Sequence, residues 1–349
     1  MKPVSLLDGG AEAFPRMVEA IGLARRSIWM EVYTFALDAW GTRVCDALCD
    51  AARRGVDVRV QVDGVGSLGS GEALAERLRA CGARVQTFNP LTGLLSGRWW
   101  RNHRKVLLVD DTVAFVGGIN VSDAYAHSDE RRGWADVALE LRGEVAAELG
   151  RRLRGGRLTP PEGAVRVWLS GLRGGLRLQG RYREALQGAR EEILLAHAYF
   201  LPSGAFVRAL CKAARRGVKV RLLLAGKSDV PLARAATARL YGRLLGAGVE
   251  VREWTHSTLH AKAAVVDGRT VLLGSFNLDA LSLVNLEALV EVKDAGVAAE
   301  LRAWMERHLA DSHDVSAGWQ RLGWLQRVVL GVVGTWVVRV QAAVARLLG

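Results

Sequence analysis

The sequence predicts an α/β protein built from two similar halves that are related by a pseudo-twofold axis. Residues 51–56 read Ala-Ala-Arg-Arg-Gly-Val, and residues 213–218 repeat them without a change. In both places an apolar strand-like run precedes a helix, and a second strand-like run follows it, which is the unit of a parallel sheet with crossover helices. Both copies then continue into the same short polar motif.

The elements follow the same order in each half. Strand-like runs of the first half cover residues 27–33, 56–62, 82–88 and 136–141, and those of the second cover 192–199, 218–224, 248–254 and 287–292. Glycines and prolines between residues 155 and 163 end the first half. The predicted divisions are therefore 1–158, 164–312 and a hydrophobic, basic C-terminal helix over 313–349. The Gly- and Arg-rich stretch 171–180 predicts a loop.

Composition restricts the choice of partner and compartment. The chain has 349 residues and a formal net charge of +12, which favours an anionic partner such as nucleic acid or an acidic membrane surface. Its four cysteines show no disulfide-scaffold pattern, so reduced, buried thiols are expected. No signal peptide opens the chain, and the apolar run 328–338 is too short to cross a bilayer. We therefore expect a cytosolic protein, or a peripheral one on the cytoplasmic face of the cell membrane.

A polar motif, His-x-Lys-(x)4-Asp followed by Gly-x-x-Asn, stands at equivalent places in the two halves. Its residues are His103, Lys105, Asp110, Gly117, Gly118 and Asn120 in the first half, and His260, Lys262, Asp267, Gly274, Ser275 and Asn277 in the second. One such match is weak evidence, as for any short motif. Two matches at equivalent positions, each with 17 positions between His and Asn, make coincidence a poor explanation.

The residue types suit phosphate chemistry. A His and a Lys two positions apart on a strand point to the same face, and the ammonium group repels a divalent cation, so neither a metal nor another cofactor is expected. Ammonium and amide groups can instead stabilise the equatorial oxygens of a pentacoordinate phosphorus. One imidazole can attack phosphorus, while the other protonates the leaving alkoxide and then deprotonates the incoming alcohol or water.

Other residues are expected to support this chemistry. Asp136 and Glu287 begin the last strand of each half and are candidates to orient the imidazoles, although a surface position is the alternative. Asp110 and Asp267 complete the motif and are counted with the catalytic set, but seven positions from each His a regular strand faces the other way, which favours a structural role in a turn. The strand-end residues Tyr33 and Tyr199 are candidate substrate contacts or packing residues, as substrate pockets form at such ends in parallel sheets.

At these residues the chain resembles the phospholipase D superfamily, over about residues 6–310. Within it the chain looks most like the bacterial cardiolipin synthases of the type-B branch, which lacks N-terminal membrane-spanning helices. The segments that carry this closer resemblance are 102–105, 114–120, 198–202, 274–279, 281–282 and 285–287. The resemblance implies two phospholipase D-type α/β/α sandwich halves with the active site at their interface.

The resemblance also implies a ping-pong reaction without metal or nucleotide. A phosphatidyl group from one phosphatidylglycerol would be held on His103 and passed to a second, giving cardiolipin and glycerol. His260 would be the general acid and base, although the reverse assignment stays open. The chain has Ala135 where many relatives have Arg. It also has Gly118 where the second half has Ser275, so the two phosphate sites are not identical. Both departures leave the identity of the acceptor alcohol open. The alternatives are a phospholipid hydrolase and a nucleic-acid phosphodiesterase of the same superfamily. Against the second, the sequence has no repeated pattern of aromatic and basic residues on which nucleic-acid bases could stack.

Two apolar regions are candidates for contact with a membrane surface, the expected partner besides the anionic lipid substrate. In the C-terminal segment, Arg321, Arg339 and Arg346 lie beside one helical face made of Leu325, Val329, Val332, Val333, Trp336 and Val340. This pattern is typical of an interfacial helix with snorkelling arginines. The alternative is a helix packed on the body or on another subunit, and the oligomeric state stays open. Trp99 and Trp100, beside Leu91, Leu94 and Leu95, form the second region.

Overall fold

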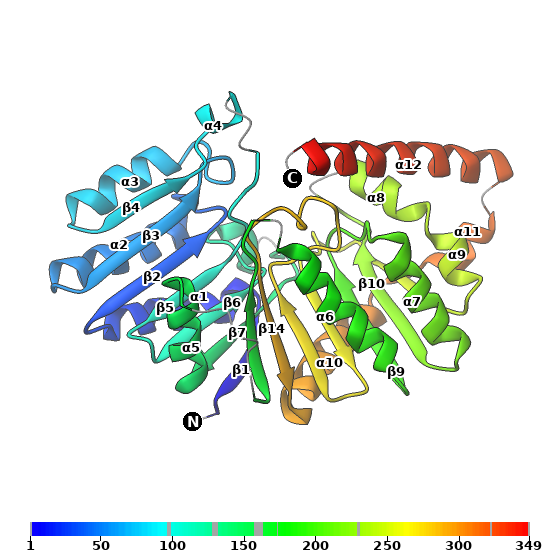
Figure 1. The fold of residues 1–349 in the computed structure, drawn as a ribbon, viewed down its shortest axis with the longest axis horizontal. Helices are drawn as coiled ribbons and strands as arrows, with labels where there is room; N and C mark the ends of the chain where they lie inside the picture. The colour runs from blue at the N-terminus through cyan, green and yellow to red at the C-terminus, as the bar shows by residue number, and fades with distance from the viewer. Residues whose placement is uncertain are drawn as a thin grey trace.

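The computed structural model describes residues 2–95, 99–127, 132–156, 163–172, 174–228, 231–321 and 323–347. It contains two mixed β-sheets, each flanked by helices, which meet side by side (Figure 1). The predicted α/β class with two similar halves is confirmed. Much of the stretch that was expected to separate the halves, residues 157–162, lies outside the described residues.

The first sheet holds seven strands in the order β1-β7-β6-β5-β2-β3-β4. Its strands are β1 (Val4–Asp8), β2 (Ser27–Val32), β3 (Asp57–Asp63), β4 (Arg84–Phe88), β5 (Val106–Val109), β6 (Val113–Gly117) and β7 (Val137–Arg142). Its helices are α1 (Gly9–Leu23), α2 (Ala39–Arg53), α3 (Gly71–Ala80), α4 (Thr92–Leu95), α5 (Glu144–Leu153) and the 3-10 turn η1 (Asp123–Tyr125). Strands β2, β3 and β4 are parallel, and the remaining pairs are antiparallel.

The second sheet has eight strands in the order β15-β11-β10-β9-β12-β13-β14-β8. Its strands are β8 (Val165–Leu169), β9 (Glu192–His197), β10 (Lys219–Ala225), β11 (Glu250–Trp254), β12 (Lys262–Val266), β13 (Thr270–Gly274), β14 (Ala288–Lys293) and β15 (His313–Asp314). Its helices are α6 (Gly175–Gly188), α7 (Gly204–Arg215), α8 (Pro231–Ala238), α9 (Tyr241–Leu245), α10 (Ala295–Ala310), α11 (Val315–Arg321) and α12 (Trp324–Leu347).

The sequence repeat corresponds to a repeat of strand pairing. Strand β2 pairs in parallel with β3 and antiparallel with β5, and β9 pairs in the same way with β10 and β12. The two halves also share one buried apolar cluster, to which Leu108 and Val116 of the first half and Val265 and Leu273 of the second belong. Because this core crosses the boundary, the sheets are held in a fixed relation, and the loops at one end of both sheets are brought together.

Two local expectations were wrong in part. The stretch 171–180 is not a loop throughout, because α6 begins at Gly175. A side chain there would come within 2.5 Å of the Leu283 backbone, so this glycine serves close packing rather than a turn. The C-terminal segment is more than one helix, since it opens with β15 and contains α11 before α12. None of the helices in the described ranges combines the length and apolarity needed to cross a bilayer.

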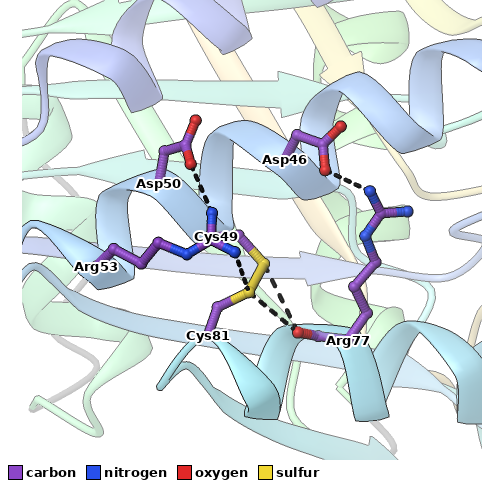
Figure 2. Close-up of a disulfide and its surroundings, with 6 residues drawn as sticks. All are labelled: Asp46, Cys49, Asp50, Arg53, Arg77 and Cys81. Atoms are coloured by element: carbon purple, nitrogen blue, oxygen red, sulfur yellow. Dashed lines mark hydrogen bonds and ion pairs between the residues drawn. A yellow bond between two sulfur atoms is a disulfide. The ribbon is translucent and has the colours of Figure 1, made fainter.

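The expectation of four reduced, buried thiols was also wrong in part. Cys49 on α2 and Cys81, directly after α3, form a disulfide, whereas Cys45 and Cys211 are buried free thiols (Figure 2). Helices α2 and α3 lie side by side on one face of the sheet, which brings together two residues 32 positions apart. Arg53 donates to the Cys81 sulfur, and Arg77 pairs with Asp46 beside it.

Replacing both disulfide cysteines with serine should lower the free energy of unfolding by about 3–4 kcal/mol, because a cross-link that closes a loop of this length restricts the unfolded chain. Urea unfolding of the oxidised protein and the Cys49→Ser, Cys81→Ser variant measures the difference. Reductant should shift the wild type towards the variant, and Cys45→Ala should keep this sensitivity. If reductant did not change the urea midpoint of the wild type, the disulfide would not stabilise the fold.

Candidate active site

The two motif histidines lie where the halves meet, just before β5 and β12. The His103 backbone N–H donates to the carbonyl of Leu286 in the second half over 2.9 Å. The His260 backbone N–H donates to the carbonyl of Ala135 in the first half over 2.8 Å. Each histidine is therefore fixed by the main chain of the other half. Burial, and after it the charges of Lys262, Lys105 and His103, lower the pKa of His260.

The carboxylates that contact the imidazoles are exchanged between the halves. His103 Nδ1 is 3.1 Å from Glu287 Oε1, and His260 Nδ1 is 2.7 Å from Asp136 Oδ2. Both acids are fully buried, so the surface alternative for them is wrong. A carboxylate on Nδ1 fixes the ring orientation and leaves Nε2 as the nitrogen available for chemistry.

The motif lysines lie beside the same imidazoles and are buried. Lys262 Nζ is 2.7 Å from His260 Nδ1, and Lys105 Nζ donates to the His103 carbonyl over 2.8 Å. Burial lowers the pKa of Lys105 to about 7, because removing an ammonium group from water disfavours its charged form. Burial and the lysine charges also lower the pKa of both imidazoles, which favours the neutral, nucleophilic form. An anionic phosphate diester would compensate the concentrated positive charge.

The two motif asparagines differ in how their side-chain amides are bonded. Asn120 Oδ1 accepts from the Thr34 N–H over 3.0 Å, and its Nδ2 donates to the Tyr125 hydroxyl over 2.8 Å. The Asn277 backbone N–H donates to Ser282 Oγ over 3.2 Å, and its Oδ1 is buried without a hydrogen-bond partner among the described residues. Asn120 therefore acts in this structure as a link between the β2–α2 loop and the wall of the site.

The structure explains why the two halves differ at Gly118 and Ser275. A side chain at position 118 would meet the Asp136 carboxylate at 2.4 Å, so only glycine leaves room for that acid. In the second half the Ser275 hydroxyl donates to the Glu287 carboxylate and accepts from the Ala288 N–H over 3.0 Å. Each residue accommodates the carboxylate of its own half. That carboxylate in turn contacts the histidine of the other half.

The other residues that were predicted to contact the substrate lie either beneath the histidines or beside them. Side chains at Gly117 and Gly274 would come within 2.6 Å of the Val137 carbonyl and 2.1 Å of the Ala288 carbonyl, so both glycines allow the close strand approach beneath the site. The Tyr33 ring lies 5.0 Å from the His103 ring, and the Tyr199 ring lies 6.3 Å from the His260 ring. Trp100 is half-buried and Trp99 is exposed at the edge; the side chains of Leu94 and Leu95 lie outside the described residues.

The motif aspartates lie at the opposite end of their strands from the imidazoles. Asp110 Oδ1 accepts from the N–H groups of Arg26 and Ser27 over 2.7 and 2.8 Å, and its Oδ2 accepts from Arg25 over 2.8 Å. Asp267 accepts in the same way from the N–H groups of Arg190, Glu191 and Glu192. Each carboxylate thus fastens the start of a central strand, β2 or β9, to a turn.

Asp110→Asn should lower the free energy of unfolding by about 1–3 kcal/mol with turnover retained, because a charged acceptor of three amides becomes a neutral one. These amides lower the Asp110 pKa, so the extra stability is present above the unfolded value of about 3.9 and is lost as pH falls through the lower folded value. Urea titrations at pH 7 and at stepwise lower pH should show that the difference in free energy of unfolding between the wild type and Asp110→Asn becomes smaller as the pH falls. Asp111→Asn, which breaks only an exposed pair with Arg154, is the control. Loss of activity in a well-folded Asp110→Asn protein would refute this role.

Sequence reasoning missed the aromatic wall around His260. The rings of Tyr125 and Trp134 lie 5.4 and 5.5 Å from the His260 ring, and the Tyr125 hydroxyl is 3.3 Å from its Nδ1. Both belong to the first half, so a motif comparison within the second half could not find them. The one available signal was the position of Trp134, two residues before Asp136.

A buried polar network lies behind His103. Asn102 donates to Glu31 and to Gln61, and its backbone N–H donates to Asp63. Arg104 reaches the same Glu31 carboxylate. This network fixes the chain that leads into His103. Within the described ranges, no group of three or more His, Cys, Asp or Glu side chains is arranged to hold a metal ion.

Comparisons with known proteins show which family and fold the chain shares. Residues 17–135 and 182–309 match the family described as "Cardiolipin synthase, PLD-like domain". Cardiolipin synthase B of Escherichia coli K12 is 32% identical over 323 residues, covering 86% of this chain and 78% of its own length. Cardiolipin synthase A of Pectobacterium carotovorum is 31% identical over 342 residues, covering 90% and 70%. The crystal structure of a phosphatidylserine synthase from Haemophilus influenzae has the same fold, with a TM-score of 0.74 at 14% identity over 99% of this chain and 95% of that one.

Proposed function

The chain belongs to the cardiolipin synthase family of phospholipase D-like proteins, and from this membership we propose that it is a phosphatidyltransferase that makes cardiolipin and glycerol from two molecules of phosphatidylglycerol. The observation that carries the proposal is the pair of imidazoles at the interface, each held by a carboxylate from the opposite half. The proposed place of action is the cytoplasmic face of the cell membrane, with the protein bound peripherally.

In the first step His103 Nε2 attacks the phosphorus of one phosphatidylglycerol, and the bond from phosphorus to the glycerol oxygen breaks. The leaving oxygen takes a proton from His260. Burial and the lysine charges lower the pKa of His260, so its protonated form depends on the bound anionic substrate and on the contact with Asp136, which oppose that shift. Lys105 and Lys262 stabilise the negative charge on the phosphoryl oxygens. Glycerol leaves, and the phosphatidyl group stays on His103.

In the second step the headgroup hydroxyl of another phosphatidylglycerol gives its proton to His260 and attacks the same phosphorus. The bond from phosphorus to nitrogen breaks, which releases cardiolipin and restores His103. The assignment of His103 as nucleophile is supported by its greater exposure, because 12% of its side chain is accessible against 6% for His260. His260 lies behind Tyr125 and Trp134, a setting suited to proton transfer with little competition from water.

Purified protein given phosphatidylglycerol in mixed micelles should form cardiolipin and free glycerol in equal amounts, with no effect of chelator. Thin-layer separation of the lipids and an enzymatic glycerol assay give both products. Phosphatidic acid as the sole lipid product would show a hydrolase instead. Cleavage of DNA or RNA without lipid turnover would show a nuclease.

A further inference from the structure

Helix α12 has a packed side and an exposed apolar side. Its Val337 is buried against Leu201 and Ala236, and Gly334 lies where a side chain would come within 3.0 Å of Ala236. On the other side Val332, Trp336 and Val340 follow one another at intervals of four residues and are 65%, 63% and 41% exposed. One face thus packs on α8, and the opposite face is exposed. The side chains of Leu325, Val329 and Arg346 lie outside the described residues.

The exposed face of α12 belongs to a wider apolar rim. Nine large hydrophobic side chains are exposed in the described part of the chain, and all except Leu23 lie in segments at the active-site end of the sheets: Leu68, Leu91, Trp99, Leu172, Leu176, Val332, Trp336 and Val340. We call these eight the apolar rim. Leu68 and Leu91 follow the ends of β3 and β4, and Leu172 follows β8. Leu23 precedes the start of β2, at the opposite end.

Hydrogen bonds that involve the main chain connect the rim to the catalytic loops. The carbonyl of Trp99 accepts from Arg101, whose own N–H donates to Asn285. Two residues before Leu172, Ser170 Oγ accepts from the Glu287 N–H over 2.7 Å. Leu201, beneath α12, donates its N–H to the Leu278 carbonyl. Figure 1 shows α4 and α12 at the same edge of the molecule, on either side of the junction between the sheets.

The charge beside this face is positive. Residues 315–349 contain four arginines and no acidic residue, and Arg321 and Arg339 are exposed. Exposed valine, leucine and tryptophan with flanking arginines are the side chains that enter the headgroup region of an anionic bilayer. A second protein copy would instead have to match this strip of positive charge with acidic groups.

We propose that the apolar rim docks on an anionic lipid bilayer, with α12 lying flat in the headgroup layer and the catalytic loops facing the membrane. Both lipid substrates would then reach the histidines without leaving the bilayer fully. The docking deepens the proposed function, which supplies the identity of the substrate, but the binding itself does not depend on turnover.

Flotation with vesicles tests the docking. The wild type should bind vesicles of phosphatidylglycerol and phosphatidylcholine, and the Val332→Ser, Trp336→Ser, Val340→Ser variant should bind about ten-fold or more weakly, because three apolar groups no longer leave water. Leu23→Ser, an equally exposed leucine at the far end, should bind like the wild type. Arg339→Glu should lose several-fold affinity for the anionic vesicles, whereas Arg25→Glu, at the far end, should not.

Activity on two forms of substrate separates this inference from the proposed function. On monomeric short-chain phosphatidylglycerol the triple variant should keep the wild-type kcat, which also shows that it is folded, while on vesicles its rate should fall with its binding. Unchanged vesicle binding by the triple variant would overturn the docking even if the wild type makes cardiolipin. A wild-type dimer that the triple variant loses, with vesicle binding unchanged, would assign the face to a second copy and overturn it as well. Absence of any lipid turnover by a vesicle-bound wild type would defeat the proposed function and leave the docking standing.

Discussion

We expect His103→Ala to remove turnover altogether, whereas His260→Ala should still complete the first half of the reaction when the leaving group needs no proton. This is the expected result if His103 is the nucleophile, because no phosphohistidine can form without it. With phosphatidylglycerol both variants should lose at least about 10³-fold in kcat, since each step then also requires proton transfer to or from His260.

A phosphatidyl p-nitrophenol ester distinguishes the two roles. The His260→Ala variant should release one equivalent of nitrophenol in a burst and keep the phosphatidyl group as an acid-labile protein adduct. The His103→Ala variant should give no burst. His313→Ala, an exposed histidine in β15, is the control for general damage and should behave like the wild type. If His103→Ala gave a burst and His260→Ala gave none, His260 would be the nucleophile and His103 the acid and base. Full activity of either variant on phosphatidylglycerol would refute the mechanism.

Asp136→Asn and Glu287→Gln should each lower kcat on phosphatidylglycerol by about 10²–10⁴-fold, because an amide cannot stabilise the imidazolium or select the same tautomer. The loss of rate in Asp136→Asn should depend on whether the leaving group needs a proton, whereas the loss in Glu287→Gln should not. Asp136 contacts the proposed acid and base, so its replacement should spare the burst with the nitrophenyl ester. Glu287 contacts the proposed nucleophile, so its replacement should slow the burst.

The control for these variants is Glu140→Gln, in β7, the strand that begins directly after Asp136. Glu140 is also buried, but it pairs with Arg16 and Arg142 away from the histidines. Its replacement should lower stability and leave kcat and the leaving-group dependence unchanged. If Asp136→Asn showed the same pattern as Glu140→Gln, Asp136 would be a structural acid only. Rate measurements on both substrates, with thermal unfolding of each variant, decide between these outcomes.

The fold and the paired motif could be predicted well from the sequence because each half of the chain repeats the other. A residue such as His260 can be interpreted through its counterpart His103, and the strand pairing of one half predicts that of the other. Comparison of the halves also identified Asp136 and Glu287 as equivalent acids. It could not predict which imidazole each acid contacts, because this depends on how the two sheets face one another.

The features that sequence reasoning missed all depend on contacts between distant segments. The disulfide between Cys49 and Cys81 follows from the packing of α2 on α3, and neither spacing nor composition indicates it. The contact of Trp134 with His260 crosses the boundary between the halves. The hydrogen bonds of the Asn120 amide to Thr34 and Tyr125 likewise could not be predicted from the motif. Local patterns give residue types and periodicity, whereas these contacts are decided by tertiary packing.

The crossed placement of the acids also bears on how such a chain could arise. Two identical subunits on a true twofold axis would lend each other their acids in the same reciprocal manner. A single ancestral half would thus have worked only as a homodimer, at concentrations that kept it paired. Joining two copies in one polypeptide makes the pairing intramolecular and independent of dilution. It also frees equivalent positions to diverge, and the contrast between Gly118 and Ser275 is the kind of asymmetry that a dimer of identical subunits could not acquire.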